Sequence, residues 1–266
     1  WNSFDRSLLL TQIKNQNLVS DDIISLKYDC ELMSSSAVKP SLSMVDILSP
    51  DLLRRYDVAP GKLPALLERF GGFTVNKWKE YGFRLIGFWT PMLGEKSNQV
   101  VYIWGWESVE ERTQKNAKWR NDPERAKVWA ESEKNGPLVN RVYNQLMEPT
   151  PYSQIDKGEA YGPDAATRAP YFFELREYQA MPQKIQNVSD RFGGFTVNAF
   201  KKYGFRQVGY WRNAIGANDH QLVYMLAWES LNERVEKFDA FGKDADRARV
   251  FGESEKNGPI VQQVTT

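Results

Sequence analysis

The chain of 266 residues contains one long stretch twice, and this repeat limits its fold more than any other feature. When the sequence is shifted against itself by 122 residues, residues 70–137 align with 192–259 without a gap. The stretch FGGFTVN, for example, stands at 70–76 and again at 192–198. A period of this length corresponds to a whole domain and not to a solenoid repeat. The sequence therefore predicts two copies of one domain.

The repeat divides the chain into four segments. Residues 1–43 have no counterpart in the repeat, so we interpret them as an N-terminal extension. The first predicted domain spans 44–148 and the second spans 171–266. Residues 149–170, which join them, are rich in proline and glycine and lack an apolar period, as is typical of a linker.

Within each copy, the apolar pattern predicts the same order of helices and strands. Helical spacing of leucine and aromatic residues predicts a first helix over 63–81 and 185–203, and capping boxes at Ser108 and Ser230 predict the start of a second. The predicted strands are 44–56, 84–91, 99–106 and 138–147, then 171–180, 206–213, 221–228 and 260–264. This β-α-β-β-α-β order is that of the ferredoxin-like fold.

The repeated glycine pair, Gly71-Gly72 in the first copy, falls within the first predicted helix. Two glycines cost about 1–2 kcal/mol in helix propensity. They would let the helix backbone approach the sheet closely, or they would mark a kink. Both interpretations are structural.

The strand predicted at 99–106 is apolar on both faces, with Val100, Tyr102 and Trp104 on one face and Val101 and Ile103 on the other. An antiparallel sheet with one face in water alternates apolar and polar residues instead. Both faces are therefore predicted to be covered, one by helices and the other by the sheet of the second copy. Two ferredoxin-like sheets that face each other in this way form an intramolecular α+β barrel, the dimeric α/β barrel within one chain.

Composition excludes some classes of protein. The net charge of +1 comes from 35 basic and 34 acidic residues, which leaves no basic excess for binding nucleic acid. No apolar run is long enough to predict a transmembrane segment, although peripheral association with a membrane stays open. The single cysteine, Cys30, excludes an internal disulfide and fits a reducing compartment such as the cytosol or the mitochondrial matrix.

Several motifs resemble the NIPSNAP family. The run YFFELREY at 171–178 is similar to the opening of the family pattern, and VGYW at 208–211 with WES at 228–230 is similar to its centre. The first copy has IGFW at 86–89 and WGWES at 104–108. The resemblance covers 44–147 and 171–264. It implies a dimeric α/β barrel in tandem and, for eukaryotic members, a mitochondrial location.

The candidate site residues are aromatic and basic. Five tryptophans could line a ligand pocket in the barrel or simply fill its core: Trp89, Trp104, Trp106, Trp211 and Trp228. Arg112 and Arg234 lie one turn inside a predicted helix, where each would pair with the preceding acids or bind an oxyanion. The one histidine, His220, falls in a polar loop and is interpreted as an exposed turn residue, and without it no Ser-His-Asp or Cys-His pair can be assembled. We predict no catalytic residue, no metal site and no cofactor.

Two functions remain. The first is a non-enzymatic NIPSNAP-like mitochondrial protein that binds other proteins, as an accessory subunit of a larger assembly of the respiratory-chain type, in the matrix or on the matrix side of the inner membrane. The extension would dock a partner through an apolar stretch that has no counterpart in the repeat: Trp1, Phe4, Leu8 and Ile13. The alternative is a cofactor-free monooxygenase-like enzyme or a small-ligand-binding barrel. An open cavity lined by tryptophan and arginine would favour this alternative, and a filled barrel would favour protein binding.

Overall fold

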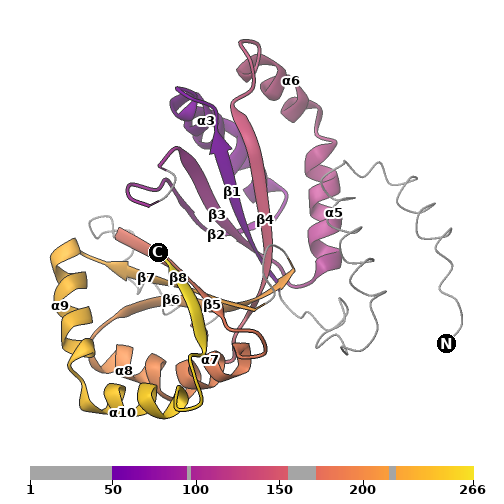
Figure 1. Cartoon of the computed structure of the whole chain (residues 1–266). Coiled ribbons are helices and arrows are strands. Elements are labelled where there is room, and N and C mark those ends of the chain that lie inside the picture. Colours follow the sequence, from indigo (N-terminus) through magenta and orange to yellow (C-terminus); the bar gives the residue numbers. More distant parts are fainter. Residues whose placement is uncertain (1–49, 95–96, 155–171, 216–219) are drawn as a thin grey trace, which may run out of the picture. The chain divides into compact units, whose positions relative to one another are not determined.

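A computed structural model of the protein describes residues 50–94, 97–154, 172–215 and 220–266, shown as a coloured ribbon in Figure 1. The predicted extension and most of the predicted linker lie outside these residues. The order β-α-β-β-α-β occurs twice, as the repeat predicts.

The first half runs from β1 to β4. Its strands are β1 (Asp51–Val58), β2 (Arg84–Trp89), β3 (Gln99–Gly105) and β4 (Val139–Pro149). Its helices are α3 (Leu63–Arg69), α4 (Val75–Glu80), α5 (Val109–Arg120) and α6 (Pro123–Ser132), with a π-helical turn at Phe70–Thr74 between α3 and α4. The opening strand lies at the end of its predicted range and runs two residues beyond it.

The second half runs from β5 to β8 and repeats this arrangement. Its strands are β5 (Phe172–Ala180), β6 (Arg206–Ile215), β7 (Gln221–Trp228) and β8 (Val261–Thr265). Its helices are α7 (Ile185–Arg191), α8 (Val197–Lys202), α9 (Leu231–Gly242) and α10 (Ala245–Ser254), with a π-helical turn at Phe192–Thr196.

The predicted capping boxes start the second helix of each half. The hydroxyl of Ser108 accepts a hydrogen bond from the backbone N–H of Glu111 at 3.0 Å, and Ser230 does the same for Glu233 at 3.1 Å. These contacts satisfy backbone N–H groups that the first turn of a helix leaves without a partner.

The eight strands form one antiparallel sheet in the order β2-β3-β1-β4-β6-β7-β5-β8. Within each half this is the ferredoxin-like order. The halves are joined where β4 pairs with β6, with Leu146 opposite Ile215 and Pro149 opposite Trp211. Among the described residues, the hydrogen-bonded ladders thus close the predicted barrel along one seam, between β4 and β6.

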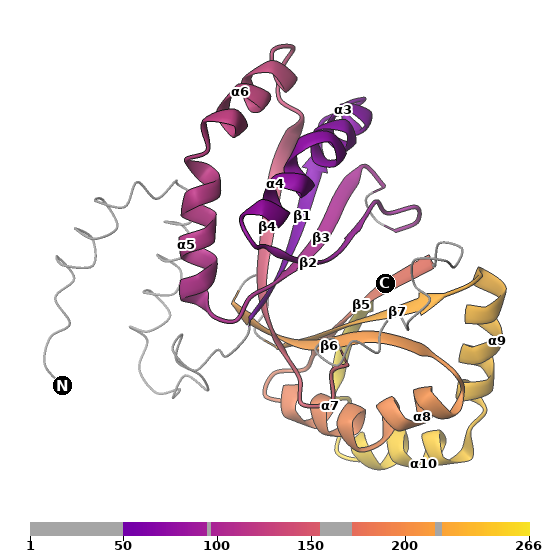
Figure 2. The same ribbon diagram turned by 180° about the vertical axis from the view of Figure 1, so that it is seen from behind.

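Each face of the sheet is covered as predicted. On one face of β3, Val100, Tyr102 and Trp104 pack against α3 and α4, which Figure 2 shows lying across the sheet of the first half. On the other face, Val101 and Ile103 belong to a cluster that includes residues of β6 and β7 in the second half. The second copy therefore supplies the second cover.

The chain after β4 packs on the second half, although a linker was predicted from residue 149. The backbone N–H of Thr150 donates to the carbonyl of Tyr210 at 3.0 Å, and the N–H of Tyr210 donates to the Ser153 hydroxyl at 3.0 Å. The ring of Tyr152 lies edge-on to Tyr210 with its hydroxyl 3.0 Å from that of Ser189. Residues 149–153 are thus part of the folded structure.

The repeated stretch ESEKNGP ties the last helix of each half to the first. In the first half, the buried guanidinium of Arg69 donates to the Ser132 hydroxyl at 3.1 Å and to the Glu133 carboxylate at 2.6 Å, and it lies over the ring of Trp129. The second half repeats this contact with Arg191, Ser254, Glu255 and Phe251. The identity of this stretch in the two copies therefore has a structural cause.

The glycine pair lies in a π-helical turn. The backbone N–H of Val75 bonds to the carbonyl of Phe70, five residues before it, so the turn holds one residue more than an α-helical turn. A Cβ added to Gly71 or Gly72 would meet no atom within 4 Å. The interpretation that these glycines allow close approach to the sheet is therefore wrong, because both face away from it into solvent. The pair marks a break in helical geometry instead.

Gly193, the counterpart of Gly71, differs from it in one respect. A Cβ at Gly193 would lie 2.8 Å from the ring of Tyr152, the residue that follows β4 onto the second half. We expect Gly193→Ala to destabilise the protein by about 1–3 kcal/mol through this overlap. Gly71→Ala, the matched control, should be neutral or stabilising by about 0.5–1 kcal/mol. Urea denaturation followed by circular dichroism measures both, and equal effects of the two changes would show that Tyr152 does not pack there.

Candidate functional site

The space between the two halves of the sheet is filled by apolar side chains. We call this cluster the barrel interior. All nine of its buried members are at most 8% exposed, and they come from both halves: Leu53, Val101, Ile103, Met147, Val208, Trp211, Val223, Met225 and Ala227. Among the described residues, these side chains pack against one another between the two halves.

One carboxylate lies at the edge of the barrel interior. Asp51 is fully buried, and its Oδ2 accepts a hydrogen bond from the indole Nε1 of Trp211 at 2.7 Å. The guanidinium of Arg84 lies 3.7 Å from Oδ1. Both groups stabilise the charged form of a carboxylate that burial alone would disfavour. Asp51 therefore has a structural role in the contact between the halves.

The contact between Asp51 and Trp211 has a counterpart related by the repeat. Trp89 corresponds to Trp211, and Phe173 corresponds to Asp51. The rings of Trp89 and Phe173 lie 5.5 Å apart. The two halves thus contact each other through equivalent positions, and an apolar pair on one side replaces a hydrogen bond on the other.

The centre of this pseudo-symmetry is occupied by an ion pair. Arg55 and Glu177 stand 122 residues apart, at equivalent positions of β1 and β5, and their side chains form a salt bridge. Arg55 also donates to Gln145 at 3.1 Å, which donates in turn to Gln221 at 3.0 Å. In a pair of identical domains, this position would bring together two like charges. The two copies have therefore diverged into complementary partners.

The five tryptophans predicted as pocket lining do not form one set. Trp89 and Trp211 belong to the barrel interior. Trp104 and Trp106 lie in the cluster between sheet and helices of the first half, and Trp228 lies in that of the second half. Successive residues of a strand point to opposite faces of the sheet. Trp89 pairs with Val101 and shares its face, whereas Trp104 lies on the other face, so the sheet separates the two tryptophans.

The two predicted arginines lie between sheet and helix. Arg234 on α9 binds Glu174 of β5 with both Nε and Nη2, each at 2.8 Å, and not the acids that precede Arg234 in the chain, as was predicted. Those acids have another partner, because Arg206 of β6 donates to Glu229 and to Glu233 at 2.6 Å each. Arg112 occupies the equivalent position on α5.

Glu174 has four donors around it. Besides Arg234, it accepts hydrogen bonds from Arg176 at 2.7 Å and from the indole Nε1 of Trp228 at 2.9 Å. Burial raises the pKa of Glu174, but the hydrogen bonds from Arg234 and Arg176 outweigh burial, so its pKa lies below the usual range. We call this arrangement the Glu174 site. It holds a carboxylate in its charged form between two arginines.

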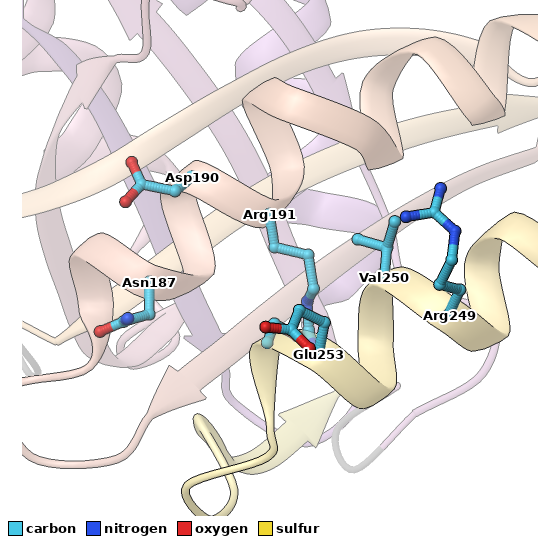
Figure 3. Close-up of a pocket in the computed structure, with 7 residues that line it drawn as sticks. Asn187, Asp190, Arg191, Arg249, Val250 and Glu253 are labelled. Atoms are coloured by element: carbon cyan, nitrogen blue, oxygen red, sulfur yellow. The ribbon is translucent and has the colours of Figure 1, made fainter.

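A shallow pocket of about 270 Å³ lies between α7 and α10 (Figure 3). Arg191 extends from α7 towards Glu253 on α10, but its guanidinium is engaged by Ser254 and Glu255. Arg249 pairs with Asp246 in the same way. Both arginines that line this pocket are thus engaged by other side chains of the protein.

Within the described residues, the structure brings together no group of histidine, cysteine and acidic side chains that could hold a metal ion. His220 is half-buried in the turn just before β7, where its backbone carbonyl accepts a hydrogen bond from the N–H of Ala180 at 2.8 Å. None of the helices in the described part is long and apolar enough to span a membrane.

Sequence reasoning missed the charged residues that matter most here, namely Asp51, Glu174 and the pair Arg55 and Glu177. One signal was available for Glu174 and Asp51. Each differs in type from its counterpart in the other copy, Leu52 and Phe173, although the nearby Arg54 and Arg176 are the same. A buried charge in one copy only is the kind of difference that the alignment of the copies can reveal.

The fold and the packed interior define a class, that of tandem α+β barrels built from two ferredoxin-like halves. The NIPSNAP family model matches residues 51–154 and 173–266, once in each half. Since these matches cover most of the chain, the protein belongs to the NIPSNAP family.

Two solved structures are similar to part of this chain. An uncharacterised NIPSNAP-like domain protein of Burkholderia xenovorans is 26% identical over 40% of this chain and 90% of its own, with a TM-score of 0.37. A NIPSNAP family protein of Agrobacterium tumefaciens is 21% identical over 39% of this chain and 94% of its own, with a TM-score of 0.35. Each of these is similar in length to one half.

A protein of Fusobacterium nucleatum that is named for a monooxygenase matches more of the chain. It covers 82% of this chain and 89% of its own at 6% identity, with a TM-score of 0.50. At this identity the likeness shows the fold alone. Among curated proteins, none matches the sequence.

Proposed function

We propose that this protein acts by binding other proteins and not by catalysis. The observation that carries the proposal is the filled barrel interior, whose side chains come from both halves. The carboxylate at its edge, Asp51, is held by Trp211 and Arg84. Because the side chains of the barrel interior join the two copies, the barrel serves as a rigid scaffold. The residues that recognise a partner then lie outside the barrel interior.

The extension at 1–43 is our candidate for recognition. It lies outside the described residues, so the proposal for it rests on its sequence, in which Trp1, Phe4 and Leu8 recur near one helical face and Ile13 continues the apolar stretch. The compact unit that contains both halves begins at Ile47, which is consistent with a core that folds without the extension. We place the protein in the mitochondrial matrix or on the matrix side of the inner membrane, as an accessory subunit of a larger assembly.

Deleting residues 1–40 should leave the thermal midpoint nearly unchanged and abolish the binding of partner proteins. The measurement is co-purification of the tagged full chain from its native source, followed by mass spectrometry. The matched control is the triple variant Phe4→Ser, Leu8→Ser and Ile13→Ser, which keeps the length of the extension and removes three of its apolar side chains. Both variants should lose the same partners.

Two outcomes would contradict the proposal. A fall of the midpoint by tens of degrees on deletion would show that the extension belongs to the core. The same partners with and without the extension would place recognition elsewhere.

A further inference from the structure

The two halves differ in what lies along the outer edge of their second strand. In the second half, the end of β4 pairs with this edge of β6, with Leu146 opposite Ile215 and Pro149 opposite Trp211. In the first half, β2 stands at the end of the sheet, and among the described residues it pairs with β3 alone. The residues of β4 that pair with β6 have no counterpart in β8, which ends at Thr265. Within the described part, the outer edge of β2 is therefore open.

The backbone of β2 nevertheless presents the same edge as that of β6. Phe88 stands opposite Tyr102 of β3, and its counterpart Tyr210 stands opposite Tyr224 of β7. The N–H and the carbonyl of Tyr210 point to the outer edge, where both bind the segment that follows β4. Because the register is the same, the N–H and the carbonyl of Phe88 point to the open edge. An edge of this kind can pair with a further strand.

The side chains along this edge are exposed in the first half only. The residues of β6 from Gln207 to Trp211 are all buried, whereas none of β2 is buried. Just after β2, Met92 and Leu93 are 75% and 79% exposed, and their counterparts Ala214 and Ile215 are half-buried. Apolar side chains at an open strand edge are typical of a surface that binds another chain.

A second observation comes from the π-helical turns. In the second half, the ring of Tyr152 packs on Gly193, where an added Cβ would lie 2.8 Å from it. In the first half, a Cβ added to Gly71 would meet no atom within 4 Å, and Gly71 is exposed where Gly193 is half-buried. Their neighbours Gly72 and Gly194 are open alike in the two halves. The first half thus keeps the glycine on which a ring packs in the second half, and no described side chain lies on it.

One difference between the halves decides which ring fits the first half. The hydroxyl of Tyr152 lies 3.0 Å from that of Ser189. The counterpart of Ser189 is Leu67, whose side chain offers neither a donor nor an acceptor. A tyrosine hydroxyl brought to this place would lose water without gaining a partner, and a phenylalanine ring would not. By the correspondence of the halves, the first half favours phenylalanine.

We propose that β2 binds an extended segment of a partner protein. This segment adds a strand antiparallel to β2 and places a phenylalanine ring on Gly71, as the end of β4 and Tyr152 do in the second half. Main-chain hydrogen bonds then contribute affinity, and the ring contributes selectivity. The inference goes beyond the proposed function, because this surface lies on the first half and does not depend on the extension.

The test uses synthetic peptides and the full chain. One peptide copies residues 145–154, QLMEPTPYSQ, and the second is the same peptide with Tyr152→Phe. Calorimetry measures the affinity of the protein for each. The phenylalanine peptide should bind roughly tenfold more tightly than the tyrosine peptide, because it buries no hydroxyl against Leu67. N-methylation of its threonine, which removes the N–H that binds the strand edge, should weaken binding about tenfold as well.

Two glycine variants of the protein locate the peptide. Gly71→Ala puts a methyl group where the ring would lie, so it should weaken binding of the phenylalanine peptide at least tenfold. Gly72→Ala is the matched control, since its counterpart in the second half touches no ring, and it should leave the affinity unchanged. The thermal midpoint of each variant shows that the fold is kept.

Four results would overturn the proposal. The full chain binds neither peptide, or Gly71→Ala and Gly72→Ala bind the peptide equally well. The peptide binds only after residues 1–40 are deleted, which would show that the extension of the chain itself occupies this edge. Light scattering finds a dimer of the full chain that the peptide dissociates, which would assign the edge to a second copy. Equal affinity with and without residues 1–40 supports the proposal, whether or not the extension binds a partner of its own.

Discussion

Replacing Trp211 by alanine should lower the free energy of unfolding by about 3–5 kcal/mol, which is a large part of the stability of an ordinary domain. Trp211 is fully buried in the barrel interior, and its indole donates to Asp51 across the two halves. The change removes the largest side chain of this cluster together with one hydrogen bond to a buried carboxylate. Urea denaturation followed by far-ultraviolet circular dichroism gives the difference.

Trp89 provides the control within the same molecule. It is the counterpart of Trp211 and also contacts the other half, through Phe173, but it is only half-buried and makes this contact with an apolar ring. Trp89→Ala should therefore cost less than half as much as Trp211→Ala. Trp211→Phe should fall between the two, because it keeps most of the apolar surface and loses the N–H. A loss from Trp89→Ala that equals or exceeds that from Trp211→Ala would show that the interior is not packed around Trp211.

The element order and the burial of both sheet faces could be predicted from the sequence because they depend on local patterns. The alternation at 99–106 placed Val101 and Ile103 on an apolar face that must be buried. The repeat indicated that the sheet of the second copy buries it. The capping serines follow from a motif four residues long. In each case, the residues that decide the outcome are close together in the chain.

The charged contacts could not be predicted in this way. Asp51 lies 160 residues from Trp211 in the sequence, and Arg55 lies 122 residues from Glu177. Neither contact produces a periodic pattern in the sequence. Arg234 was assigned to its neighbours on the helix because these are the nearest acids in sequence, yet its guanidinium reaches across to β5. The partner of a long side chain depends on which residues are close in space, and a single sequence does not show this.

The alternation of residues along the strands could not decide whether the five tryptophans line one pocket. Period-two alternation places Trp104 and Trp106 on one face of β3, but it does not say whether helices or the second sheet cover that face. The structure assigns this face to the helices. The tryptophans in the barrel interior come from β2 and β6, where they follow a glycine at a position of irregular register.

The most direct test of the account separates the two halves. Each half alone would expose the apolar face that now forms the barrel interior, an area well above the few hundred square ångströms that soluble monomers tolerate. Fragments 44–154 and 168–266, made separately, should aggregate or self-pair. Self-pairing would place Arg55 against Arg55 or Glu177 against Glu177, so the mixed pair should be preferred.

The measurement is size-exclusion chromatography with light scattering on each fragment alone and on the two co-expressed. We predict a soluble one-to-one complex, which Arg55→Glu in the first fragment weakens and Glu177→Arg in the second restores. If either fragment alone runs as a monomer that unfolds cooperatively, the two copies are not halves of one barrel, and the account is wrong.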